Sequence, residues 1–210
     1  MRFACTTPAY AAIYARWLAN PGGLLDFAGY TPGERLLDLC GGTGAVSQEA
    51  LRRGADPASI MLVDLNPRCP DPIRQETADA NGVFAWGRQF DLIVIRQAAA
   101  YLDWDRGLVT HLWRLLATSQ GRLVFNLFVR PKWSAQTYRY EGRRFFEASG
   151  YFGRTVWHVQ AGRAGVDVSR FRWLDTDDLR HRLERWFVVE VQEKGASQRW
   201  LCTPKDKRDV

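Results

Sequence analysis

The stretch 36–50, LLDLCGGTGAVSQEA, begins as an apolar run, turns through three glycines within four positions, and continues in a helical pattern. A strand that ends in a glycine turn and enters a helix presents backbone N–H groups at the carboxyl edge of a sheet, where open α/β folds bind ligands. Asp38 lies inside the apolar run, and a buried carboxylate requires a partner. The stretch therefore predicts a ligand site whose chemistry depends on what pairs with Asp38.

Strands and helices alternate along the chain from this stretch onward, which is typical of an open, mostly parallel α/β sheet. After the strand ERLLDLC we expect a helix over 43–53, a second strand over 59–65 and a poor third over 73–77. A strong strand, FDLIVIR at 90–96, precedes a helix within 103–117 and a further strand at 122–128. Prolines at 67, 70 and 72 forbid a normal helix between the second and third strands, so we expect a loop there.

The remaining elements differ in character. Residues 9–19 read as an amphipathic helix, closed by the PGG at 21–23. The segment 129–173 is rich in aromatics and arginine and contains an expected hairpin around GRAG. Thr176 is the expected N-cap of the next helix, and FVVEVQE and QRWLCTP form a terminal hairpin. We expect a single Rossmann-like domain over 1–210, whose sheet ends in an antiparallel hairpin, with an N-terminal helix and 129–173 as a β-rich substrate lid.

Composition narrows the function classes. The chain has 210 residues, 46% of them apolar, and a net charge of +6. No apolar stretch approaches 18 residues and the N-terminus lacks a signal-peptide pattern, so we expect a cytoplasmic protein without a membrane span. The four cysteines are scattered, which argues against zinc and disulfides. The arginines are dispersed, which favours a solvated basic surface over nucleic-acid binding.

Asp38 discriminates between two cofactor classes. A dinucleotide needs Gly-x-Gly-x-x-Gly, and the nearest match here replaces the third glycine with Ser47. A carboxylate before the glycines would repel a pyrophosphate but would pair with an ammonium group. S-adenosylmethionine carries a methionyl ammonium and a sulfonium, so it fits better.

These residues resemble the first motif of the class I S-adenosylmethionine-dependent methyltransferases, an acidic residue followed after two positions by a glycine turn. The resemblance covers residues 33–127 well and the remainder weakly. It implies a cofactor site in which Asp38 faces the methionyl part, Asp64 takes the ribose hydroxyls, and Asp79 accepts from the adenine amino group. The cofactor residues that it implies are Asp38, Cys40, Gly41, Gly42, Gly44, Asp64, Leu65, Asn66, Asp79, Ala80, Arg96 and Gln97. Tyr14, in the expected N-terminal helix, is a further cofactor residue that would close the site from one side.

The acceptor wall is expected from outside the shared core, because the N-terminal helix and the 129–173 insertion lie beyond it. The aromatic substrate residues from these segments are Tyr10, Trp17, Trp133, Tyr138 and Tyr140, with Phe145, Phe146 and Trp157 as further members of an aromatic box. Tyr101, at the exit of the fourth strand, is the substrate residue expected from the shared core. His158 alternates with Val156 and Gln160 and is the candidate general base. No metal is expected.

Three functions remain open from the sequence. The first is methyl transfer to an oxygen or nitrogen of a small molecule by a monomer or homodimer. The second is an RNA or protein methyltransferase, against which the fourth strand exits as IRQAAAY, without an Asn-Pro-Pro-Tyr type signature. The third is a non-methylating enzyme that uses bound S-adenosylmethionine in a cyclisation or rearrangement.

Overall fold

In the computed structural model, the described residues are 20–206, except 86, 117, 129–133, 141–142, 153–154, 163–164, 173–174 and 195–196; within 134–172 the description is of the backbone alone. The chain divides into two compact units. The larger unit holds a seven-stranded sheet and the smaller one a four-stranded sheet.

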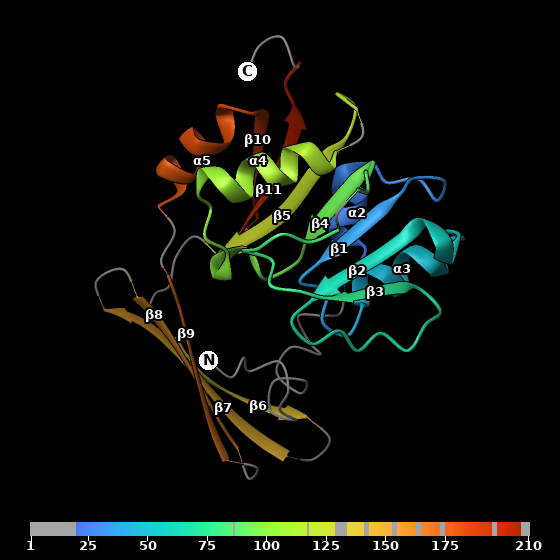
Figure 1. Cartoon of the computed structure of the whole chain (residues 1–210). Helices are drawn as coiled ribbons and strands as arrows, with labels where there is room; N and C mark the ends of the chain where they lie inside the picture. Colours follow the sequence, from blue (N-terminus) through green and yellow to red (C-terminus); the bar gives the residue numbers. More distant parts are fainter. Residues whose placement is uncertain are drawn as a thin grey trace. The chain divides into compact units, whose positions relative to one another are not determined.

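The seven-stranded sheet has the order β10-β11-β5-β4-β1-β2-β3. Its first four strands in the chain are parallel, and β5 pairs in parallel with β4 and antiparallel with β11. The elements of this unit are α2 (Gly23–Ala28), β1 (Leu36–Leu39), α3 (Ala45–Arg52), the 3-10 turn η2 (Pro57–Ser59), β2 (Ile60–Asp64), β3 (Arg74–Thr77), β4 (Leu92–Ile95), the 3-10 turn η3 (Ala99–Tyr101), α4 (Arg106–Leu115), β5 (Arg122–Phe128), α5 (Thr176–Glu184), β10 (Phe187–Lys194) and β11 (Ser197–Pro204) (Figure 1). The expected parallel α/β sheet with a terminal antiparallel hairpin is therefore confirmed.

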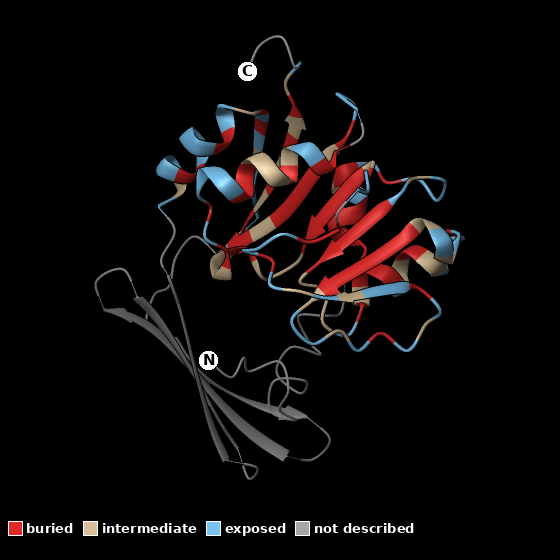
Figure 2. Ribbon diagram, viewed as in Figure 1, coloured by how far each residue is buried: buried red, intermediate tan, exposed pale blue. Residues whose placement is uncertain are grey.

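Helices cover both faces of this sheet. On one face, α2 and α3 share a core with side chains of the central strands, including Leu36, Leu62 and Val94. On the other face, α4 lies beside α5, and the rings of Trp113 and Trp186 meet at 5.4 Å (Figure 1). The central strands are buried on both sides, as Figure 2 shows, because parallel strands sandwiched between helices require apolar residues at consecutive positions.

A loop connects β2 to β3 where such a fold usually has a helix, as the prolines predicted. Cys69 in this loop is buried against the glycine turn: a Cβ added at Gly44 would lie 2.5 Å from its Sγ. The side chain of Gln75 receives the N–H of Cys69 at 3.2 Å and donates to its carbonyl at 2.8 Å. These contacts hold the loop against the start of α3.

Three sequence-based boundaries are corrected. The N-cap of α5 is Asp175, whose Oδ1 accepts the N–H groups of residues 177 and 178, so Thr176 is the first helical residue. The aspartate is a strong cap because its short carboxylate reaches both donors. The PGG at 21–23 leads directly into α2, which sequence reasoning missed, and α3 begins at Ala45 because Gly44 has a φ of +76°.

The smaller unit contains an antiparallel sheet in the order β6-β7-β8-β9. Its strands are β6 (Ser134–Tyr140), β7 (Arg143–Phe152), β8 (Thr155–Gly162) and β9 (Gly165–Arg172). The expected β-rich segment and its hairpin are confirmed, since β8 and β9 pair with Gly162 opposite Gly165. The expected helix at 9–19 lies outside the described residues.

Candidate functional site

Asp38 occupies the centre of the sheet, with Leu62 of β2 and Val94 of β4 as its neighbours in register. Its side chain is 1% exposed. One carboxylate oxygen, Oδ2, accepts both the hydroxyl of Ser47 at 2.7 Å and the N–H of Ser47 at 3.1 Å. The other oxygen, Oδ1, has no hydrogen-bond donor within the described part of the chain.

The electrostatics of Asp38 follow from this burial. Removal from water raises the pKa of its carboxyl to about 6, against the lowering effect of the Ser47 hydrogen bonds and of the charge of Arg96. The nearby charge of Asp64 acts in the same direction as burial. A buried carboxylate with one unpaired oxygen is costly, and a cationic group bound beside it would offset that cost.

Gly41 lies directly over the carboxylate. A Cβ at this position would be 2.7 Å from Cγ of Asp38 and 2.8 Å from each oxygen. Only glycine therefore permits this approach of the main chain to Asp38. The turn continues through Gly42, and the N–H of Gly44 closes it on the carbonyl of Gly41 at 2.8 Å.

Asp64 ends β2 one strand away and is oriented by the main chain. Its Oδ2 accepts the N–H of Gly42 at 3.0 Å, and its Oδ1 accepts the N–H of Asn66 at 2.8 Å. Each oxygen retains a lone pair, because a carboxylate oxygen can accept two hydrogen bonds. Leu65, next to it, is 45% exposed, an unusual position for a large apolar side chain in the described chain.

Asp79 lies at the same carboxyl edge of the sheet as Asp64, because the adjacent residue Ala78 is hydrogen-bonded to Asp64. The N–H of Ala78 donates to the carbonyl of Asp64 at 3.1 Å, and Oδ1 of Asp79 accepts the N–H of Asn81 at 2.9 Å. Asp79 is exposed and Ala80 is buried. The structure thus places the predicted ribose and adenine residues at neighbouring strand ends.

The ends of β1 and β4 carry residues in the left-handed backbone region. Cys40 has a φ of 60° and Gln97 a φ of 58°. Non-glycine residues rarely adopt this conformation, and such positions concentrate at functional sites. The N–H of Gln97 donates to Oδ1 of Asn126 in β5 at 2.7 Å, which holds the turn after β4 in place.

Two residues of this edge were missed by sequence reasoning. In the sequence Ser47 stands where a dinucleotide motif has its third glycine, and in the structure it faces Asp38 from the first turn of α3. Asn126 interrupts the apolar strand RLVFNLF, which is the same signal that singled out Asp38.

Several predicted residues cannot be placed in a site. Tyr10, Tyr14, Trp17 and Trp133 lie outside the described residues. Tyr138 and Tyr140 belong to β6, Phe145 and Phe146 to β7, and Trp157 and His158 to β8, but their side chains lie outside the description as well. Tyr101 lies in η3, half-buried.

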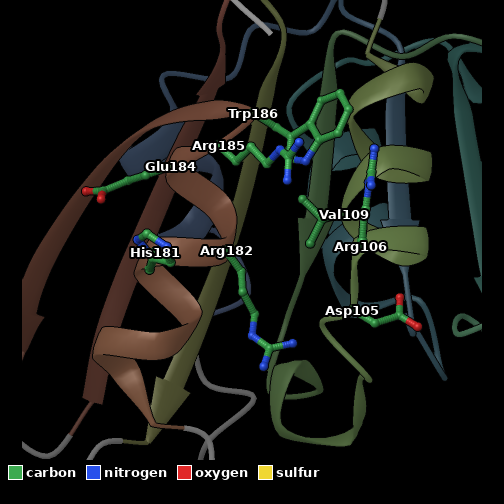
Figure 3. A pocket seen from close by; sticks show the side chains of 8 residues that line it. All are labelled: Asp105, Arg106, Val109, His181, Arg182, Glu184, Arg185 and Trp186. Carbon is green, nitrogen blue, oxygen red and sulfur yellow. The ribbon is translucent and has the colours of Figure 1, made fainter.

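The other two histidines lie apart from this edge. His111 of α4 is hydrogen-bonded through Nε2 to the carbonyl of Phe84 at 3.0 Å, which makes it a packing residue. His181 of α5 lines a cavity of about 490 Å³ between α4 and α5 (Figure 3). None of the predicted site residues lines that cavity, whose wall is Asp105, Arg106, Val109, His181, Arg182, Glu184, Arg185 and Trp186.

Comparison with solved structures identifies the fold. The DesVI protein of Streptomyces venezuelae superimposes with a TM-score of 0.70 at 20% identity, over 94% of this chain and 97% of that one. An S-adenosylmethionine-dependent methyltransferase from Clostridium acetobutylicum gives a TM-score of 0.67 at 14% identity, over 93% and 96%. The chain has the fold of the class I S-adenosylmethionine-dependent methyltransferases.

A third structure with this methyltransferase fold contains the ligand. The magnesium protoporphyrin IX methyltransferase of Synechocystis, solved with bound S-adenosylmethionine, matches with a TM-score of 0.56 at 12% identity, over 95% of this chain and 85% of that one. Comparison of the sequence with models of protein families gives no match, and comparison with curated proteins gives none. No described helix is both long and apolar enough to cross a membrane.

Proposed function

We propose that this chain binds S-adenosylmethionine at the carboxyl ends of β1, β2 and β4 and transfers its methyl group to an oxygen or nitrogen of a small molecule. The observation that carries the proposal is the unpaired, buried Oδ1 of Asp38 beneath Gly41. The methionyl ammonium of S-adenosylmethionine can donate a hydrogen bond to this oxygen and offset its negative charge. The methyltransferase fold supports S-adenosylmethionine as the ligand.

The residues divide the ligand among them. Asp38 would receive the methionyl ammonium, and Arg96, whose charge already acts on Asp38, would receive the methionyl carboxylate. Asp64 would accept from the two ribose hydroxyls, since the N–H groups of Gly42 and Asn66 orient its carboxylate and leave a lone pair on each oxygen. Leu65 and the turn at Asp79 would flank the base.

The bound ligand supplies an activated methyl group for in-line displacement. The protein therefore has chiefly to orient the acceptor, and for an oxygen or nitrogen acceptor to take up its proton. His158 remains the proposed base, and the insertion 129–173 the proposed acceptor-binding segment. We propose a soluble protein of the cytoplasm, acting on a small molecule.

Calorimetric titration with S-adenosylhomocysteine tests the ligand assignment, because this compound keeps the ammonium, ribose and adenine. We expect binding by the wild type and a loss of at least tenfold in affinity in Asp64→Ala. The exposed Asp177→Ala in α5 is the matched control. Indifference of the wild type at millimolar concentration, or preferential binding of a nicotinamide nucleotide, would overturn the proposal.

Mass spectrometry separates the reaction classes. A product that gains 14 daltons from the acceptor identifies methyl transfer, whereas an isomeric product identifies the non-methylating alternative. Binding that weakens with salt in the presence of RNA would identify a nucleic-acid substrate instead.

A further inference from the structure

Polar residues form a row across the carboxyl edge of the sheet, from the centre toward β11. Asp38 stands on β1, and Arg96 follows β4, close enough for its charge to lower the pKa of Asp38. Asn126 stands on β5 and is paired in register with Arg199 on β11. Of these four strands, β11 lies farthest from the proposed S-adenosylmethionine site.

Asn126 and Arg199 project from the face that α2 covers. Val124 and Leu201 belong to the α2 side of the core, and alternate residues of a strand point to the same face. Phe125 and Trp200, between them, stack at 5.5 Å on the opposite face. The side chain of Ser47, on α3, reaches Asp38 from the same side as α2, so the row continues the face of the candidate ligand site.

Asn126 connects this row to the exit of β4. Its Oδ1 accepts the N–H of Gln97, the residue with a φ of 58° that follows Arg96. In the proposed function the methyl group is delivered near this turn. A group bound beside Asn126 is therefore beyond the methionyl site and on the acceptor side.

Arg199 is half-buried, and no carboxylate in the described part of the chain pairs with its guanidinium. The contrast with Arg122 is informative, because that residue lies at the amino end of β5 and pairs with Glu34. Arg35, beside the amino end of β1, likewise pairs with Asp91 at 3.0 Å. A half-buried cation without a counter-charge is costly, and an anionic ligand would offset that cost.

We propose that Arg199, with the amide of Asn126, binds a carboxylate group of the methyl acceptor. The inference rests on the proposed function, since it assigns the acceptor class to the same site. One guanidinium matches the charge and the two oxygens of a single carboxylate. Arg199 on β11 lies two strands from β4. Because neighbouring strands are about 4.8 Å apart, the acceptor spans roughly 10 Å between its carboxylate and its reacting atom.

The experiment uses the full-length protein saturated with S-adenosylhomocysteine. A set of matched fragment pairs, each a carboxylic acid and its primary amide, is screened by ligand-observed NMR, so that members of a pair differ chiefly in charge. We expect the carboxylates to bind at least tenfold more tightly than their amides. Arg199→Gln removes that preference, and Arg199→Lys retains part of it.

Arg114→Gln, at an exposed position of α4, is the control and keeps the wild-type preference. Equal binding of acids and amides, no binding of any acid, or an unchanged preference in Arg199→Gln overturns the inference. Titration with S-adenosylhomocysteine is measured on every variant. Failure of that titration in the wild type rejects the proposed function, whereas its success without a carboxylate preference rejects only the acceptor assignment.

Discussion

Asp38 combines a stability cost with a proposed role in ligand binding. Moving the pKa of a carboxyl group from 3.8 to about 6 by burial corresponds to about 3 kcal/mol at pH 7, which disfavours the folded state when the site holds no cation. The folded protein binds the proton more tightly than the unfolded chain. Stability therefore falls as pH rises from about 4 to about 6 and levels off above that.

We predict that Asp38→Asn raises the stability of the unliganded protein and weakens ligand binding. The neutral side chain removes the buried charge, so the free energy of unfolding at pH 7.5 should rise by about 1 kcal/mol or more. Affinity for S-adenosylhomocysteine should fall at least about 30-fold, because a charge-assisted interaction is lost. Denaturant unfolding and calorimetry measure the two effects, with Asp177→Asn as control. An affinity equal to that of the wild type would contradict the role of Asp38.

The pH dependence of binding is a separate prediction. Binding of the ammonium requires the ionised form of Asp38, so affinity for S-adenosylhomocysteine should be constant above pH 7 and decrease below pH 6. The decrease approaches about tenfold per pH unit when one proton must be released. Calorimetry between pH 4.5 and 8 measures it. Asp38→Asn should show no such slope, and a slope that persists in this variant would assign the titration to another group.

At the scale of elements, the loop between β2 and β3 takes the place of a helix and is held by a small number of contacts. Gln75 of β3 holds Cys69 by two hydrogen bonds, and Cys69 packs against Gly44 at the start of α3. The N–H of Arg68 donates to the carbonyl of Gly42 at 2.8 Å. The loop therefore supports the glycine turn from outside.

We predict that Gln75→Ala destabilises the protein by about 1–2 kcal/mol, the range for two hydrogen bonds to partly buried main chain. Affinity for S-adenosylhomocysteine should fall several-fold as well, because the glycine turn loses its support. Gln192→Ala, at an exposed position of β10, is the control. Denaturant unfolding and calorimetry measure the two effects. A loss of stability with unchanged affinity would separate the loop from the site.

At the scale of the whole molecule, two units share one chain. The larger unit contains Asp38, Asp64 and Asp79, the three carboxylates of the proposed S-adenosylmethionine site. Its sheet is interrupted in the chain after β5 and resumes with α5, β10 and β11. Antiparallel pairing of β11 with β5 restores continuity, so the sheet is complete without residues 129–174.

We predict that replacing residues 129–174 by a flexible Gly-Ser linker of about 12 residues leaves a folded protein that binds S-adenosylhomocysteine within a few-fold of the wild-type affinity. The carboxylate preference of Arg199 should persist, since Arg199 and Asn126 remain. Thermal unfolding, calorimetry and the fragment screen measure these properties. Loss of S-adenosylhomocysteine binding in a folded deletion protein would show that the insertion contributes to the ligand site.

Local patterns in the sequence determined much of this molecule. The apolar runs predicted β1, β2, β4 and β5, the prolines predicted the loop after β2, and the terminal hairpin followed from alternation. Each of these depends on contacts or backbone restrictions within a few residues. The glycine turn and Asp38 likewise indicated a ligand site at the carboxyl edge of the sheet, because a carboxylate within an apolar strand requires a partner.

Only the tertiary structure decided which groups meet across the sheet. It paired Asp38 with Ser47, set Asn126 beneath Gln97, and inserted β11 between β5 and β10 so that Arg199 reached the same edge. Asp38 and Ser47 are 9 positions apart in the chain, and Glu34 and Arg122, which also pair, are 88 positions apart. Such meetings depend on strand order and register, which arise from the packing of the whole core and leave no periodic trace in the sequence.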